Sequence, residues 1–194
     1  MSHMAPNSET FLSAADQDAL IGLERFRAEN FSIEEIRSAA DRATYLRYLE
    51  SHYQRLGFMS EWVLPSADSR QFFVRFKNEM AGLFRLTSVT GDSIFHDLVP
   101  GCRDAGCRLL ELNNVLLGEQ FRSGPALGLI LYRSACEAHA SGYDFVVGLT
   151  RVQVLRFMVD FGVVPAEHPP LSAMGKDHLL DFVTYFDTKG ESSI

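Results

Sequence analysis

The chain has 194 residues, of which 46% are hydrophobic and 22% charged, enough for one domain with a well-filled core. Its formal net charge of −7 disfavours a nucleic-acid-binding protein, because such proteins carry an excess of basic residues. Residues 1–4 are interpreted as a cloning remnant, and residues 5–194 are expected to form a single domain. No stretch reaches the roughly 18 consecutive apolar residues of a membrane span, so we expect a soluble cytoplasmic protein.

The three cysteines, Cys102, Cys107 and Cys136, are an odd number at spacings that match no zinc site. A reducing compartment accounts for unpaired thiols, which agrees with a cytoplasmic location. The histidines share no metal-binding spacing either, so we expect no metal ion.

Two helices are expected before any strand. Each is opened by a capping-box pattern, Ser13 with Asp16 for helix 13–29 and Ser32 with Glu35 for helix 32–57. The second helix also has an apolar stripe with steps of three or four residues, formed by Leu46, Leu49, Tyr53 and Leu56, and should end at Gly57.

After Pro65 the pattern changes to that of strands, and ranges 71–77 and 80–89 predict a hairpin with its turn at Asn78. The elements expected next are a loop with a short helix at 91–101, a strand at 107–117, a helix at 125–141, a strand at 143–149, a helix at 152–161 ended by Gly162, and a strand at 179–186. This order predicts a mixed α/β sheet of five to seven strands flanked by helices.

The segment from Val115 to Leu131 reads as a strand that breaks into a glycine-containing loop and continues as a helix. Such a loop directs unpaired backbone N–H groups and the positive end of the helix at one point, where an anionic phosphate would bind. An ordinary strand-to-helix turn is the alternative interpretation.

The loop residues Phe121, Arg122, Ser123, Gly124, Pro125 and Ala126, followed by an apolar helix, resemble the acyl-CoA-binding motif of GNAT acyltransferases, Q/R-x-x-G-x-G/A. Gly124 and Ala126 occupy the two small positions, whereas Phe121 stands where Gln or Arg is usual and Arg122 follows it. The resemblance implies the GNAT fold and binding of acyl-CoA or an acyl-carrier protein by these six residues. Met158 stands where many members carry a tyrosine acid.

A narrower resemblance covers Gly82–Leu86, Phe95–Pro100 and Leu110–Val115, which occur in the order seen in acyl-homoserine-lactone autoinducer synthases and long-chain N-acyl amino acid synthases. It implies a small, amino-acid-like amine as the acceptor. Asn114 replaces an arginine of those families and becomes a candidate substrate-binding residue. The backbone N–H groups around Leu116 and Leu117 would stabilise the oxyanion.

Acyl transfer to an amine requires a base, because a free amine with a pKa near 10 is protonated at neutral pH. Glu111, Asn113 and Asn114 interrupt an apolar run in an expected central strand, where unpaired polar groups are costly. Burial would raise the pKa of Glu111 toward the range of a base, so Glu111 and Asn113 are the candidate catalytic residues. A turn at Asn113 and Asn114, with Glu111 in solvent, is the alternative.

Arg85 is a candidate for binding a carboxylate on the acceptor, since guanidinium groups pair with carboxylates, although a surface role fits equally. Three classes of function remain open. The first is an N-acyltransferase that uses acyl-CoA or acyl-carrier protein. The second is an acetyl-CoA-dependent enzyme acting on a protein or a small amine. The third is a non-catalytic protein that binds acyl-CoA.

Overall fold

The computed structural model describes residues 28–55, 68–91, 93–122, 124–173 and 176–188. Most of the predicted helix 13–29 and the predicted helix end at Leu56 and Gly57 lie outside these residues.

One mixed sheet of eight strands runs through the described residues in the order β1-β2-β3-β4-β5-β8-β6, with β7 paired to β8. Its strands are β1 (Phe31–Glu35), β2 (Ser69–Phe76), β3 (Glu79–Ser88), β4 (Leu109–Leu117), β5 (Phe145–Arg151), β6 (Val164–Pro165), β7 (Leu171–Ala173) and β8 (Lys176–Asp187). The predicted mixed α/β class is confirmed. The sheet exceeds the predicted number of strands because β1 was expected to be helical and the short β6 and β7 carry little strand signal.

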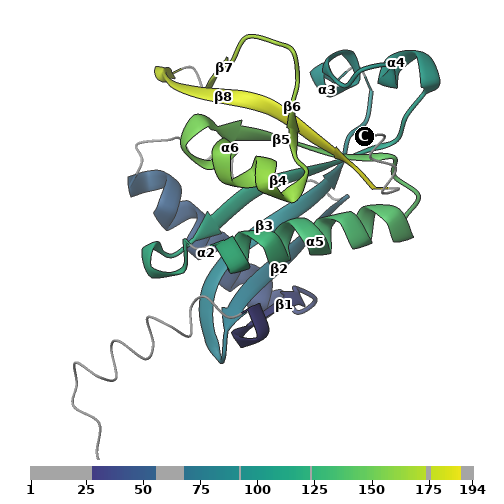
Figure 1. The fold of residues 1–194 in the computed structure, drawn as a ribbon. Coiled ribbons are helices and arrows are strands. Elements are labelled where there is room, and N and C mark those ends of the chain that lie inside the picture. The colour runs from purple at the N-terminus through teal and green to yellow at the C-terminus, as the bar shows by residue number, and fades with distance from the viewer. Residues whose placement is uncertain (1–27, 56–67, 92, 123, 174–175, 189–194) are drawn as a thin grey trace, which may run out of the picture.

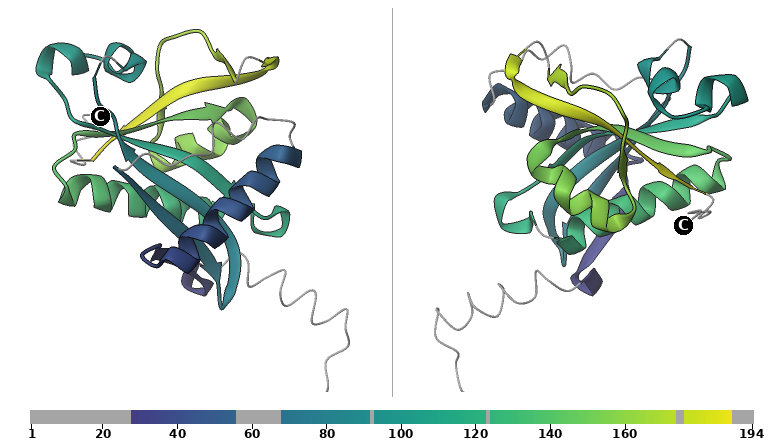
Figure 2. Two further views of the ribbon diagram at one scale, coloured as in Figure 1. Left: turned by 180° about the vertical axis from the view of Figure 1, so that it is seen from behind. Right: turned by 45° about the horizontal axis from the view of Figure 1, so that its top comes forward.

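Helices cover both faces of this sheet. They are α2 (Ala39–Arg55), α3 (Ile94–Leu98), α4 (Cys102–Ala105), α5 (Gly124–Ala140) and α6 (Val152–Met158), with 3-10 turns η1 (Ala28–Asn30), η3 (Glu119–Phe121) and η4 (Val159–Phe161). In Figure 1, α5 and α6 lie in front of the sheet and α2 lies behind it. The view from behind in Figure 2 shows α2 crossing one part of the far face, with α3 and α4 at another part.

From β2 onward the elements follow the predicted order, including the hairpin, the short helix near residue 95 and the alternation from β4 to β8. The prediction of a helix from Ser32 is wrong. Residues Phe31–Glu35 form strand β1, which pairs antiparallel with β2 and alternates buried and exposed positions. The helix begins at Ala39 instead, where the side chain of Ser38 accepts a hydrogen bond from the Asp41 backbone N–H at 3.0 Å. Ser38, not Ser32, caps this helix.

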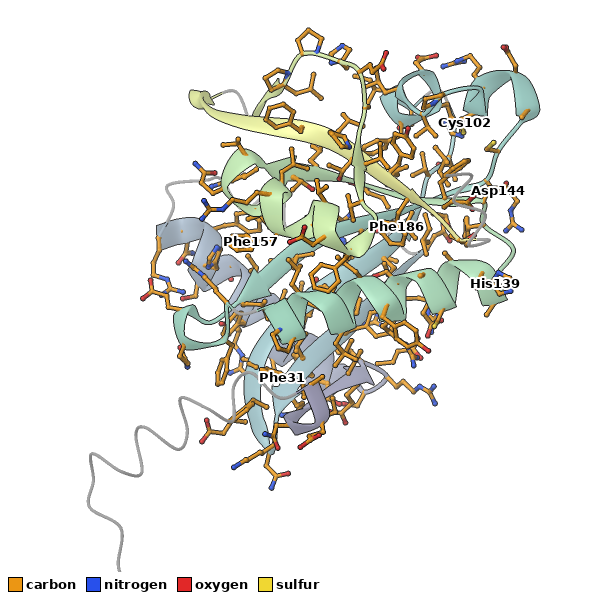
Figure 3. All side chains as sticks on the ribbon, in the orientation of Figure 1. Phe31, Cys102, His139, Asp144, Phe157 and Phe186 are labelled. Atoms are coloured by element: carbon orange, nitrogen blue, oxygen red, sulfur yellow. The ribbon has the colours of Figure 1, made fainter. Side chains whose placement is uncertain are left out.

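Apolar side chains form a cluster on each side of the sheet. Under α5, the cluster contains residues from six strands, from α5 and α6 and from the turn η3. Figure 3 labels two of its members, Phe31 of β1 and Phe186 of β8, toward opposite edges of the sheet. On the other face, Tyr45, Leu49 and Tyr53 of α2 pack against Phe73 and Leu83. A third cluster joins Cys102 and its neighbours on α3 and α4 to Leu109, Val147 and Val183.

The centre of the sheet departs from regular pairing at two places, one between β3 and β4 and the other between β4 and β5. The β3–β4 register shifts between Leu83 and Arg85, and Asn114 of β4 has a φ of +52°. This is the geometry of a β-bulge, in which an extra residue bends one strand. Within the described residues, β4 pairs with β5 only from Leu109 to Glu111, although the two strands continue to Leu117 and Arg151. The two strands therefore separate beyond Glu111.

Candidate functional site

Four polar side chains occupy neighbouring positions of β3 and β4 at the middle of the sheet. Arg85 lies opposite Asn113, and Thr87 lies opposite Glu111. They alternate with Leu86 and other side chains of the α5-side cluster, so they point to the opposite face. On that face they lie between the α2 cluster and the α3–α4 cluster. We call Arg85, Thr87, Glu111 and Asn113 the polar strip.

Hydrogen bonds connect the polar strip across the two strands. Arg85 Nε donates to Asn113 Oδ1 at 2.7 Å, and Asn113 Nδ2 donates to Thr87 Oγ1 at 3.5 Å. Burial raises the pKa of Glu111 above its ordinary value of 4.5, while the Asn113 amide and the Arg85 charge oppose the shift. Glu111 and Asn113 lie in strand β4, as predicted, and not in the alternative turn. The polar strip thus combines a carboxylate of raised pKa with the hydrogen-bonded cation of Arg85.

The next residue, Asn114, directs its amide toward α2. Tyr53 donates its hydroxyl to Asn114 Oδ1 at 2.8 Å. Among the described residues, Asn114 Nδ2 and the hydroxyl oxygen of the fully buried Tyr45 have no hydrogen-bond partner. Burial raises the pKa of Tyr45 to about 12, and the Arg85 charge and the Asn114 amide lower it, so these groups lie near one another.

Tyr45 and Tyr53 were not predicted as site residues. Tyr53 was identified only as part of an apolar stripe, and both are buried members of the α2 cluster. Their spacing of eight residues fits one face of a helix, and the sequence shows no sign that the Tyr53 hydroxyl meets a strand residue 61 positions away. The phenol hydroxyl itself was the available signal, because a buried tyrosine needs a polar partner.

The predicted donor loop lies where β4 ends. The 17-residue helix α5 begins at Gly124, which is exposed, and a Cβ added there would meet no heavy atom within 4 Å. Arg122 is exposed just before it and donates from Nε to the Leu117 carbonyl at 3.3 Å. The first residue of α5 thus has open space at its Cβ position, and a cation lies two residues before it. Ser123 lies outside the described residues.

The remaining predicted donor residues are less exposed. The Phe121 ring is buried and its centroid lies 5.3 Å from the Phe76 ring centroid, so its side chain belongs to the core. Ala126 is fully buried, and Pro125 is half-buried. In β4, Leu116 packs against the α2 cluster and Leu117 against the α5-side cluster.

Positive charge gathers near the same end of β4. The pKa of His52 is lowered by burial and by the charges of Arg55, Arg122 and Arg151. These residues come from the end of α2, the loop before α5 and the end of β5. The cluster stands out in a chain whose formal net charge is −7. Such a cluster favours an anionic ligand.

Met158, which stands where related sequences carry a tyrosine acid, is buried in the α5-side cluster, and Thr150 Oγ1 lies 3.5 Å from its sulfur. Among the described residues, no group of three or more His, Cys, Asp or Glu could hold a metal ion. None of the described helices is long and apolar enough to cross a membrane.

The sequence matches no protein-family model and no curated protein sequence. Solved structures, by contrast, match over most of the chain. FeeM, an N-acyl amino acid synthase from uncultured soil microbes, has a TM-score of 0.65 at 11% identity, covering 82% of this chain and 92% of its own. NAA60 of Arabidopsis thaliana, solved with acetyl-CoA, has a TM-score of 0.63 at 13% identity, covering 82% and 99%.

A spermidine N-acetyltransferase from Vibrio cholerae matches with a TM-score of 0.58 at 10% identity, covering 83% of this chain and 95% of its own. At such identities the likeness is one of fold. The chain has the GNAT fold, as the resemblance of its loop and strand motifs implied.

Proposed function

We propose that the protein is an N-acyltransferase that moves an acyl group from an acyl-CoA or acyl-carrier-protein thioester to the amine of a small, amino-acid-like acceptor. The observation that carries this proposal is the position of Glu111. Its carboxylate has a raised pKa and lies at the last paired residue of β4 before that strand leaves β5. A base is therefore available beside the place where the strands open.

The proposed reaction needs few protein groups. Glu111, directly or through a water molecule, takes a proton from the acceptor ammonium, and the free amine attacks the thioester carbonyl carbon. Backbone N–H groups near Leu116 and Leu117 stabilise the resulting oxyanion. The C–S bond then breaks and the amide forms. The nitrogen loses a second proton in this step, and the departing sulfur takes up one proton and leaves as a thiol. Asn113 holds Arg85 in place through its amide oxygen.

The donor site in this proposal is the α5 N-terminus. Gly124, Pro125 and Ala126 give the donor phosphates close access to the helix end, and Arg122 supplies positive charge. Arg85 is proposed to bind a carboxylate of the acceptor, which suits a guanidinium already held by Asn113. Asn114 has its amide against α2, so its part in acceptor binding is proposed to be indirect.

Two other functions are each supported by one observation. Similarity to NAA60, which was solved with acetyl-CoA, favours an acetyl-CoA-dependent enzyme. The buried Met158 in place of a tyrosine acid favours a protein that binds acyl-CoA without turning it over.

One assay separates the three. The purified chain is given acetyl, octanoyl and palmitoyl thioesters of CoA and of carrier protein, with a panel of amino acids and amines, and N-acyl products are measured by mass spectrometry. Turnover with a long-chain thioester and an amino acid supports the proposal. Preference for acetyl-CoA supports the second function, and CoA binding with no product from any pair supports the third.

The donor site is tested by Gly124→Glu, which adds a negative charge where the fold has free space. CoA affinity, measured by calorimetry, should fall by about tenfold or more because of charge repulsion and lost access to the helix end. Gly124→Ala, which adds no charge, is the matched control. Arg122→Ala should weaken CoA by about tenfold at most, as expected for an exposed contact. Affinity within about twofold of the parent protein in Gly124→Glu would show that the donor binds elsewhere.

A further inference from the structure

Helix α2 contacts the bulge of β4 through tyrosine hydroxyls. Tyr53 is 8% exposed and donates to Asn114 Oδ1 at 2.8 Å, and Tyr45, two turns earlier, is fully buried with its hydroxyl near the same amide. The Asn114 side chain is thus joined to α2 by the Tyr53 hydroxyl.

Asn114 is the residue that makes β4 irregular. Only it and Lys77 among the described non-glycine residues have positive φ, and Lys77 belongs to the turn between β2 and β3. A residue with a side chain enters this region at a cost, which asparagine bears better than most. A side-chain hydrogen bond from a fixed partner selects this conformation over extended ones.

The bulge also sets the direction of β4 between the residues on its two sides. Glu111 is three residues earlier, and Leu116 and Leu117 follow two and three residues later. Across from these residues, a Cβ on Gly82 would lie 2.2 Å from the Leu116 carbonyl oxygen, so β3 and β4 are in close contact after the bulge. A change in the Asn114 backbone therefore changes the direction of the strand relative to Glu111.

We propose that Tyr53 is a positioning residue that, by hydrogen bonding to Asn114, holds the left-handed bulge of β4 and so fixes the backbone beyond Glu111. The effect on the strand stands on the geometry alone. The effect on turnover rests on the proposed function, because it requires that the backbone after the bulge faces the thioester.

The test uses three variants of the full chain. Tyr53→Phe removes only the hydroxyl oxygen. Asn114→Gly removes the amide and permits positive φ without it. The double variant closes a thermodynamic cycle, since two residues that act through one contact give non-additive effects. Tyr48→Phe is the control, because it removes a hydroxyl from a half-buried tyrosine of the same helix that packs against the same cluster.

Amide hydrogen exchange of residues 112–118, measured without substrate, reports directly on the local stability of β4 and the residue after it. Tyr53→Phe should speed exchange there by about fivefold or more while leaving β8 unchanged, and Tyr48→Phe should not. In turnover assays kcat should fall by about tenfold with the donor KM unchanged, because small misplacement of reacting groups lowers rate more than binding. The double variant should match Asn114→Gly in both measurements.

Unchanged exchange at 112–118 in Tyr53→Phe overturns the proposal, and so do losses that multiply in the double variant. If the parent protein turns over no donor and amine, the proposed enzymatic function fails, and the exchange measurement alone decides the positioning role. A loss of kcat without faster exchange also overturns it, since the hydroxyl would then act on the reaction by another route.

Discussion

At the level of single residues, Glu111 is the side chain on which the proposed chemistry depends. Glu111→Gln keeps the size of the side chain and its capacity for hydrogen bonds but cannot take a proton. We expect kcat to fall by about a hundredfold or more, with CoA affinity within about twofold of the parent protein. Steady-state kinetics and calorimetry measure the two quantities.

The pH dependence of the rate is a second test of Glu111 as the base, and it uses the same variant. Burial raises the pKa of Glu111 above 4.5, so the parent rate should rise with pH through a pKa above that value. The rise should disappear in Glu111→Gln. Near-normal turnover across this range, with circular dichroism unchanged, would show that another group takes the proton.

Glu111 should also make stability depend on pH. Its native pKa is raised, so between pH 4.5 and that pKa the unfolded chain releases a proton that the native state retains. The contribution of Glu111 to the free energy of unfolding is therefore full at low pH and is lost as pH rises. We expect Glu111→Gln to gain stability relative to the parent protein as pH increases from 4.5 to neutral. Urea unfolding at a series of pH values measures it, and a difference independent of pH would contradict the burial of this carboxyl.

At the level of elements, α2 shows how a cap decides where a helix starts. Ser38 accepts from the Asp41 N–H at 3.0 Å, which supplies a partner for a backbone donor in the first turn. Ser38→Ala should lower the free energy of unfolding by about 1 kcal/mol, whereas Ser38→Thr should cost a few tenths. Denaturant unfolding checks both.

Although α2 holds Tyr53, a loosened N-terminus about four turns away should leave kcat nearly unchanged. A kcat loss in Ser38→Ala comparable to that in Tyr53→Phe would mean that the whole helix, and not the tyrosine contact, controls β4.

At the level of the whole molecule, donor binding should couple to global stability, because CoA binds the native state and not the unfolded chain. A concentration of about 100 times Kd adds about 2.7 kcal/mol, which for a domain of this size raises Tm by roughly 5–10 °C. Thermal unfolding monitored by circular dichroism measures this shift. Pantetheine, which lacks the phosphates, should raise Tm less, and Gly124→Glu should remove most of the shift. An equal shift with CoA and pantetheine would argue against a phosphate site at α5.

The sequence by itself determined the order of elements from β2 onward, because each element there carries a local signal: alternation in the hairpin, the apolar run of β5, and Gly162 after α6. It also identified the polar residues of β4 as unusual for a central strand. It failed at Phe31–Glu35, where Ser32 and Glu35 have capping-box spacing but the segment gains more by pairing with β2 and burying Phe31. Local propensity is a weak force compared with pairing and burial.

Tertiary structure alone decided which residues meet. Phe121 occupies a motif position in the sequence, yet its ring fills the core, because only packing sets which way a loop side chain turns. The separation of β4 from β5 and the left-handed Asn114 depend on strand register, a property of two segments together. Tyr53 and Asn114 are 61 residues apart, and no periodicity in either segment encodes their contact. Local patterns fix elements because neighbouring residues share a backbone, whereas a site is fixed by distances between elements that only the packed core determines.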